Sequence, residues 1–72
     1  MDELRRIGVH EIVLPNGDIL HQAVVEIMND FVVNYYEFRD ELPMVEWFGG
    51  TIEVMREEEG LTAYQNGKRI MN

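Results

Sequence analysis

Two histidines, His10 and His21, are the side chains of this chain best suited to holding a metal ion. If Asn16-Gly17 forms a two-residue hairpin turn, both imidazoles lie diagonally on one face of the paired strands, about 7 Å apart at the backbone. Zinc sites take three or four protein ligands, whereas the chain has 2 histidines and 0 cysteines. A small metal-binding protein, completed by a nearby carboxylate, is therefore an alternative. The prediction is two half-exposed strand residues and no bound metal.

Catalytic chemistry finds little support among the other side chains. A nucleophilic mechanism needs an activated hydroxyl or thiol, but the chain has no cysteine or serine, and its only aliphatic hydroxyls belong to Thr51 and Thr62. A lone glutamate on an alternating strand usually marks the solvent side, which accounts for most of the carboxylates here. We therefore predict no enzyme, no catalytic residue and no cofactor.

The aromatic residues are more suggestive of a contact surface. They cluster before and after a proline at position 43, and the candidate interface residues are Tyr35, Tyr36, Trp47 and Phe48. Alternation along a strand sends Tyr35 and Tyr36 to opposite faces, so one of the two rings lies outside any single core. Trp and Tyr are enriched at interfaces, which favours a homodimer, while large rings that simply fill a small core are the alternative.

Charge and composition restrict the partners and the compartment. Fourteen acidic and six basic residues give a net charge of −8, which repels phosphate backbones and anionic membranes, so we expect neither nucleic-acid nor membrane binding. The absence of cysteine fits a reducing compartment. The first six residues place acidic side chains ahead of a basic pair and lack an apolar stretch, unlike a secretory signal, so the expected location is cytoplasmic.

Three short turn signals divide the chain into apolar runs: Asn16-Gly17, Asn29-Asp30 and Asn66-Gly67. Such pairs reach the positive φ angles that tight hairpins need at both central residues. The runs between them are rich in β-branched and aromatic residues. We predict one all-β domain over residues 1–72, with residues 1–6 as a candidate disordered end. Six or seven short antiparallel strands, joined by hairpins, would form a small barrel or a two-sheet sandwich.

The turns also predict the strand registers. The first hairpin should pair Leu14 with Ile19 and Ile12 with His21. The second should pair Ile27 with Val32 and Val25 with Asn34. Both faces of the resulting sheet are apolar, so each must be covered, either by the curled continuation of the same chain or by another chain.

The remaining segments complete the prediction. Residues 39–43 should form a connection, Gly49-Gly50 a turn or bulge, and residues 56–60 a charged loop. Residues 18–30 also fit helical spacing, but their β-branched content favours a strand. The predicted core is Ile12, Val25, Ile27, Val33, Ile52, Val54, Leu61 and Ile70.

Residues 11–54 resemble the small β domain that flanks the catalytic barrel of amidohydrolases and related metal-dependent hydrolases. The matching segments are Leu14-Pro15-Asn16-Gly17-Asp18, Ala23-Val24-Val25-Glu26-Ile27, Phe31-Val32-Val33 and Glu46-Trp47-Phe48-Gly49-Gly50-Thr51-Ile52. The whole chain also resembles short bacterial all-β proteins. In the hydrolases a His-x-His metal motif follows, but here Glu53-Val54-Met55-Arg56 stands in its place, so the resemblance implies no catalytic residue. It implies an accessory domain that docks onto a hydrolase barrel.

The sequence thus predicts a non-catalytic interaction or structural module that associates with itself. The aromatic strand and the Trp47 region would form its contact surface. Docking onto a hydrolase barrel and metal binding through His10 and His21 are the alternatives.

Overall fold

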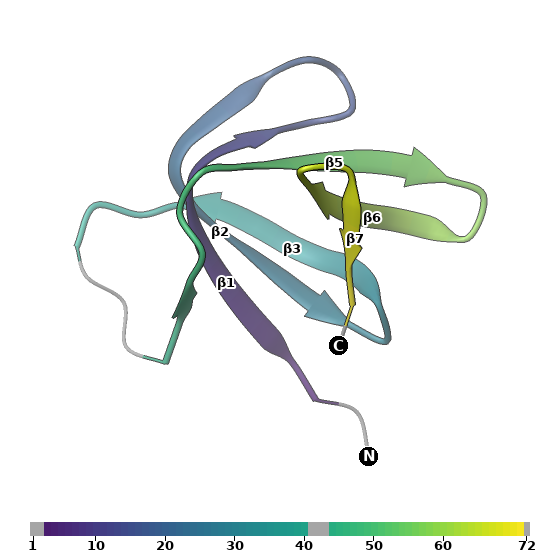
Figure 1. Cartoon of the computed structure of the whole chain (residues 1–72), viewed down its shortest axis with the longest axis horizontal. Coiled ribbons are helices and arrows are strands. Elements are labelled where there is room, and N and C mark those ends of the chain that lie inside the picture. Colours follow the sequence, from purple (N-terminus) through teal and green to yellow (C-terminus); the bar gives the residue numbers. More distant parts are fainter. Residues whose placement is uncertain (1–2, 41–43, 72) are drawn as a thin grey trace.

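A computed structural model describes residues 3–40 and 44–71, which form seven strands and no helix. The strands are β1 (Arg5–Val13), β2 (Ile19–Met28), β3 (Phe31–Glu37), β4 (Glu46–Trp47), β5 (Thr51–Glu57), β6 (Gly60–Gln65) and β7 (Lys68–Ile70). Figure 1 shows them wrapped around a common centre. The all-β prediction is confirmed, and the helical alternative for residues 18–30 is excluded by β2.

Five of the strands close into a small barrel. They run in the order β2-β3-β6-β5-β1, and β1 pairs with β2 to close the ring. β4 and β7 lie outside the ring, on β1 and β6 respectively (Figure 1). The barrel is thus the architecture formed, rather than the sandwich. The prediction of purely antiparallel pairing is corrected, because β1 pairs in parallel with both β4 and β5.

The first hairpin differs from the prediction by one residue. Val13 pairs with Ile19 and Glu11 with His21, because the loop contains three residues rather than two. The amide of Gly17 donates to the Leu14 carbonyl at 2.9 Å, and the Leu14 amide donates to the Asp18 carbonyl at 2.8 Å. Pro15 fixes the φ angle of the turn, and Gly17 alone takes a positive φ, of 94°. A proline directly before Asn-Gly therefore lengthens the loop.

The other two Asn-containing turns have the predicted geometry. Asn29 and Asp30 have φ angles of 54° and 68°, and Asn66 and Gly67 have 53° and 80°. In the last hairpin Ala63 pairs with Ile70, as a two-residue turn at Asn66-Gly67 requires.

The second hairpin starts in the predicted register and then shifts. Ile27 pairs with Val32 as expected, but Glu26 then pairs with Asn34, so Val33 is an extra residue on β3. This bulge turns Val33 outward and leaves it 56% exposed, so its place in the predicted core was wrong.

Residues from the five barrel strands, together with Ile70 of β7, fill the interior. Of the predicted core, Ile12, Val25, Ile27, Ile52, Val54 and Ile70 are buried, and Leu61 packs against them half-buried. Sequence analysis missed Ile7, Val9, Ala23, Val32 and Ala63, which complete the cluster.

Segment boundaries bring two further corrections. β1 begins at Arg5, inside the stretch considered for disorder. The predicted charged loop at 56–60 is shorter, because β5 continues through Glu57 and pairs it with Gly60. The predicted connection at 39–43 extends through residues 41–43, which lie outside the described residues.

The bulge at Val33 predicts that truncation of two neighbouring valines has unequal effects on the free energy of unfolding. We expect Val32→Ala to lower the free energy of unfolding by about 2 kcal/mol, because it opens a cavity in the core. Val33→Ala should change it by less than about 0.5 kcal/mol. Urea denaturation followed by circular dichroism measures both. Equal losses would contradict the shifted register.

Candidate functional site

The outer face of the barrel carries a row of residues from four adjacent strands. Trp47 of β4 pairs with Gly8 of β1, Gly8 pairs with Val24 of β2, and Val24 pairs with Tyr36 of β3. Paired residues on neighbouring strands share a face, so these four positions lie side by side across the sheet. Val24 is fully buried, although the residues on either side of it belong to the barrel interior. A second small apolar layer therefore lies outside the barrel.

Gly8 makes this outer layer possible. A Cβ atom at position 8 would stand 2.9 Å from Cε3 of Trp47 and 2.9 Å from Cγ1 of Val45. The missing side chain lets the indole and Val45 approach the backbone of β1. Residues 45–47 thus cover the outer face at this point. The second apolar face of the sheet is therefore covered here by the same chain.

Hydrogen bonds and an ion pair fix β4 in this position. The Gly8 carbonyl accepts hydrogen bonds from the amides of Phe48, at 2.9 Å, and Gly49, at 3.3 Å. The Arg5 guanidinium donates to both carboxylate oxygens of Glu46, at 2.8 and 3.0 Å, and to the Met71 carbonyl at 2.6 Å. The same guanidinium lies 5.3 Å from the centre of the Phe48 ring. Arg5 therefore ties β4 and the residue after β7 to the start of β1.

The electrostatics of the Arg5–Glu46 pair follow from this geometry. The hydrogen bond from Arg5 lowers the pKa of Glu46 below its ordinary value, and the charge of Arg5 adds to the effect. The pKa of Arg5 rises in turn, chiefly through the same hydrogen bond. The two charges therefore offset each other at neutral pH.

The predicted interface residues occupy different environments. Trp47 is 55% exposed on the outer face, where its ring centre lies 5.0 Å from that of His10. Phe48 is 39% exposed and turns to the Arg5 side of β4. Tyr35 packs half-buried against the barrel core. The structure therefore brings Trp47 and Tyr36 into one row and separates them from Tyr35 and Phe48.

Tyr36 belongs to a polar cluster at the other end of the row. Its hydroxyl donates to the Glu26 carboxylate at 3.2 Å, and Arg6 donates to the same carboxylate oxygen at 2.9 Å. Burial and this hydrogen bond raise the pKa of Tyr36. The cluster holds the Tyr36 hydroxyl on the strand that pairs with Val24 and gives Tyr36 a structural role.

The two histidines are engaged separately. The His10 ring contacts Trp47 at a tilt of 40°, whereas Nδ1 of His21 lies 3.6 Å from the Glu11 carboxylate. The shared face predicted for the imidazoles depended on a hairpin register that is wrong by one residue, so the metal alternative loses its geometric basis. Within residues 3–40 and 44–71, no group of three or more His, Cys, Asp or Glu side chains could hold a metal ion.

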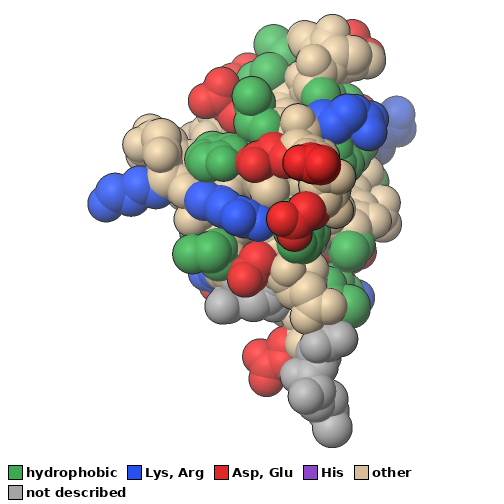
Figure 2. Space-filling model, turned by 90° about the vertical axis from the view of Figure 1, so that its right-hand side faces the viewer, with side chains coloured by type: hydrophobic (Ala, Val, Ile, Leu, Met, Phe, Trp, Pro, Cys, Tyr) green, Lys and Arg blue, Asp and Glu red, His purple; other side chains and the backbone are tan. Residues whose placement is uncertain are grey.

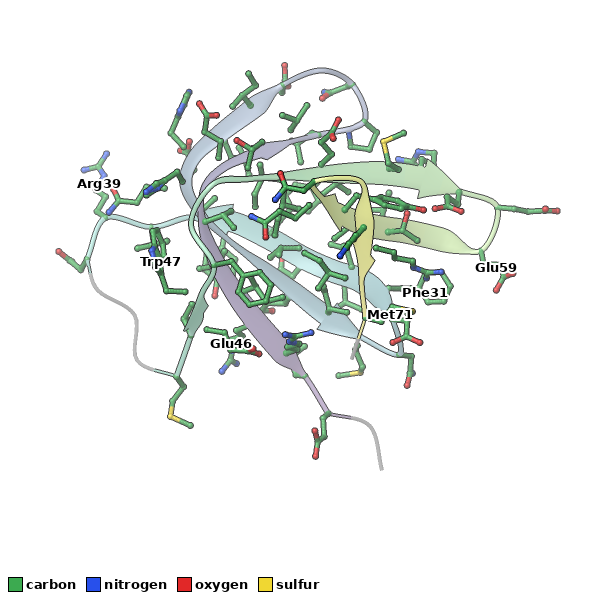
Figure 3. All side chains as sticks on the ribbon, in the orientation of Figure 1. Phe31, Arg39, Glu46, Trp47, Glu59 and Met71 are labelled. Atoms are coloured by element: carbon green, nitrogen blue, oxygen red, sulfur yellow. The ribbon has the colours of Figure 1, made fainter. Side chains whose placement is uncertain are left out.

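Exposed hydrophobic side chains concentrate around β4, a feature that sequence analysis found only in part. Eight large hydrophobic residues of the described chain are exposed. Four of them form what we term the β4 surface: Leu4, Met44, Trp47 and Phe48, with Trp47 and Phe48 on different sides of β4. Leu4 and Met44 line one hollow together with Arg5 and Glu46. Figure 3 shows Trp47 and Glu46 on the side of the molecule away from the β5–β6 turn.

Comparison with known proteins adds no identification. No protein-family model matches the chain, and neither a curated protein nor a solved structure does. The resemblance to the accessory domain of amidohydrolases stays a prediction. The described residues also contain no helix long and apolar enough to cross a membrane.

The contact between Gly8 and Trp47 yields a test of the outer layer. Gly8→Ala should lower the free energy of unfolding by about 1 to 3 kcal/mol, because the new methyl group collides with the indole and with Val45. In a Trp47→Ala background the same substitution should cost less, since one of the two clashes is gone. Urea denaturation of the four proteins gives this coupling energy. Equal costs in both backgrounds would contradict the packing.

The Arg5–Glu46 pair predicts a dependence of stability on pH. Because folding lowers the pKa of Glu46, the pair stabilises the fold above the ordinary carboxyl value of 4.5, and this contribution is lost as pH falls through the folded-state pKa. Both groups are partly exposed, so we expect Glu46→Gln to cost less than about 1 kcal/mol at pH 7, and to cost less at pH 3 than at pH 7. Urea midpoints at the two pH values measure this. Glu59→Gln, at the distant β5–β6 turn, controls for net charge, and a constant difference would refute the assignment.

Proposed function

We propose that this protein is a non-catalytic interaction module that associates with a second copy of itself through the β4 surface. The observation that carries the proposal is that four of the eight exposed large hydrophobic residues of the described chain lie in β4, beside it, or in the hollow next to it. Exposed apolar side chains that gather on a small protein are typical of contact sites. Trp47 is the proposed anchor.

The preorganised position of Trp47 supports this role. Its ring rests on Gly8 and against His10, yet more than half of the side chain remains exposed. An aromatic side chain that is already fixed loses little conformational entropy when a partner covers it. Trp is also among the residues most enriched at the energetic centres of interfaces.

The charge around β4 also suits two identical partners. With a net charge of −8, most approaches between copies are repulsive. At the β4 surface, however, Glu46 is neutralised by Arg5. The distribution of charge therefore favours this face over the acidic remainder of the surface. A cytoplasmic location, consistent with the absence of cysteine, is part of the same proposal.

Trp47 is the only tryptophan, so its fluorescence reports on the proposed contact directly. We expect the emission of the unmodified protein to shift to shorter wavelength, and quenching by iodide to fall, as concentration rises. Sedimentation equilibrium should show a dimer over the same range. An exposed indole in a monomer at about 100 µM, a concentration that detects association free energies of roughly 5.5 kcal/mol or stronger, would refute the proposal.

A variant pair separates the anchor from general hydrophobicity. Trp47→Ala should weaken dimerisation by on the order of 1 to 3 kcal/mol, because it removes the buried ring. Ile19→Ala removes a side chain that is 47% exposed elsewhere on the surface and should leave dimerisation unchanged. Circular dichroism confirms that both variants remain folded. Equal weakening by the two variants would contradict a localised contact.

A further inference from the structure

A second feature of the surface lies on the opposite side of the molecule, on the outer face of β5 and β6. It is a hollow of about 390 Å³, lined by Glu53, Met55, Arg56, Glu57, Tyr64 and Gly67. Met55 is 48% exposed, and Tyr64 pairs with Glu53 across the two strands. The hollow thus combines apolar surface, an aromatic ring and two carboxylates.

One of these carboxylates is held in a fixed orientation. Glu57 accepts hydrogen bonds from the Thr62 hydroxyl at 2.5 Å and from the Tyr64 hydroxyl at 2.9 Å, both to the same oxygen. Thr62 is 1% exposed and is the one buried polar or charged residue within the described chain. Its hydroxyl is therefore directed at a surface carboxylate rather than at the core.

Both hydrogen-bond donors are neutral hydroxyls, so they orient the carboxylate without cancelling its charge. They lower the pKa of Glu57, and the charge of Arg69 adds a smaller contribution in the same direction. Glu57 thus stays ionised at neutral pH with its second oxygen outside this pair of bonds. The lining as a whole, with two carboxylates against the guanidinium of Arg56, is negative by one charge.

These contacts suit one kind of ligand. A long cationic side chain has an apolar stem, which can lie along Met55, and a charged head, which can meet Glu53 and Glu57 beside the Tyr64 ring. We propose that the hollow binds an arginine side chain presented by a basic segment of a partner protein. Arginine fits better than lysine, because its planar head stacks on an aromatic ring while it donates to a carboxylate.

The surroundings of the hollow favour the same partner. Glu58 and Glu59 form the adjacent turn, and Figure 2 shows carboxylates beside hydrophobic side chains and Lys or Arg side chains on this end of the molecule. A net charge of −8 attracts a basic segment over a distance of about one Debye length. Trp47 and Glu59 lie on opposite sides of the molecule in Figure 3, so this site is separate from the β4 surface.

Titration with two capped pentapeptides, followed by amide ¹H–¹⁵N NMR, tests the proposal. One peptide carries arginine between alanines, and the other carries citrulline, which has the same shape without the charge. The arginine peptide should produce saturable shifts at Met55, Glu57 and Tyr64, with an affinity in the millimolar range, and the citrulline peptide should produce much smaller ones. A single exposed ion pair that binds more weakly than about 20 mM is not detected by this titration. Chemical shifts at these residues that do not saturate by about 20 mM arginine peptide would therefore overturn the proposal.

Two variants with the same net charge distinguish a built site from diffuse attraction. Glu57→Gln should weaken binding at least about threefold, because it removes the oriented charge. Glu59→Gln removes a neighbouring charge outside the lining and should leave the affinity within about twofold. Amide spectra confirm that both variants remain folded. Equal weakening by the two would show general attraction by an acidic surface and would overturn the assignment of the hollow.

Discussion

The barrel depends on one carbonyl group. The oxygen of Gly50 accepts hydrogen bonds from two consecutive amides of β1, those of His10 at 3.0 Å and Glu11 at 3.1 Å. Two residues opposite one partner make a bulge, which bends the strand and increases its twist. Before this bend β1 pairs with β4, and after it β1 pairs with β5. A strand that changes partner within nine residues can close a ring of only five strands.

The same bend explains the burial pattern of β1 and β2. Ile7 and Val9 face the core before it and Ile12 faces the core after it, so the inward parity changes. On β2 the matching position is Gln22, which has a φ angle of 51°. Because both strands bend together, the N-terminal half of β1 diverges from β5 and pairs with β4 on that edge instead. On the outer face there, Gly8, Val24 and Trp47 build the second apolar layer.

Whether the sequence could predict a feature of this structure depends on how far apart in the sequence the interacting residues lie. The turns at Asn29-Asp30 and Asn66-Gly67 have the predicted type because two residues determine their backbone angles. The first turn could have been placed correctly by giving Pro15 its full weight, since proline favours the first central position of a type I turn. The bulge at Val33 has no comparable local signal. The parallel pairing of β1 with β4 and β5 joins residues about forty positions apart, and no local pattern encodes it.

The candidate sites divide in the same way. The alternation of side chains along a strand correctly predicted that Tyr35 and Tyr36 lie on opposite faces, because this alternation is a local property of the backbone. The partnership of Trp47 with Gly8 could not be predicted, since it requires a two-residue strand to find a glycine far away in the sequence. Likewise, three consecutive glutamates after Arg56 do not indicate that Glu57 accepts hydrogen bonds from Thr62 and Tyr64. That selection follows from the antiparallel pairing of β5 and β6, which carries both hydroxyls to the same side as Glu57.

Tertiary pairing thus converts a uniformly acidic composition into two unlike surfaces. At β4 the ion pair with Arg5 removes the charge of Glu46 and leaves hydrophobic side chains exposed. At β5 and β6 hydroxyl groups orient the charge of Glu57 without removing it. The proposed second copy would therefore meet the first surface, and the proposed basic segment would meet the second. Since Trp47 and Glu59 lie on opposite sides of the molecule in Figure 3, a dimer formed through β4 would leave two oriented acidic hollows open to a partner.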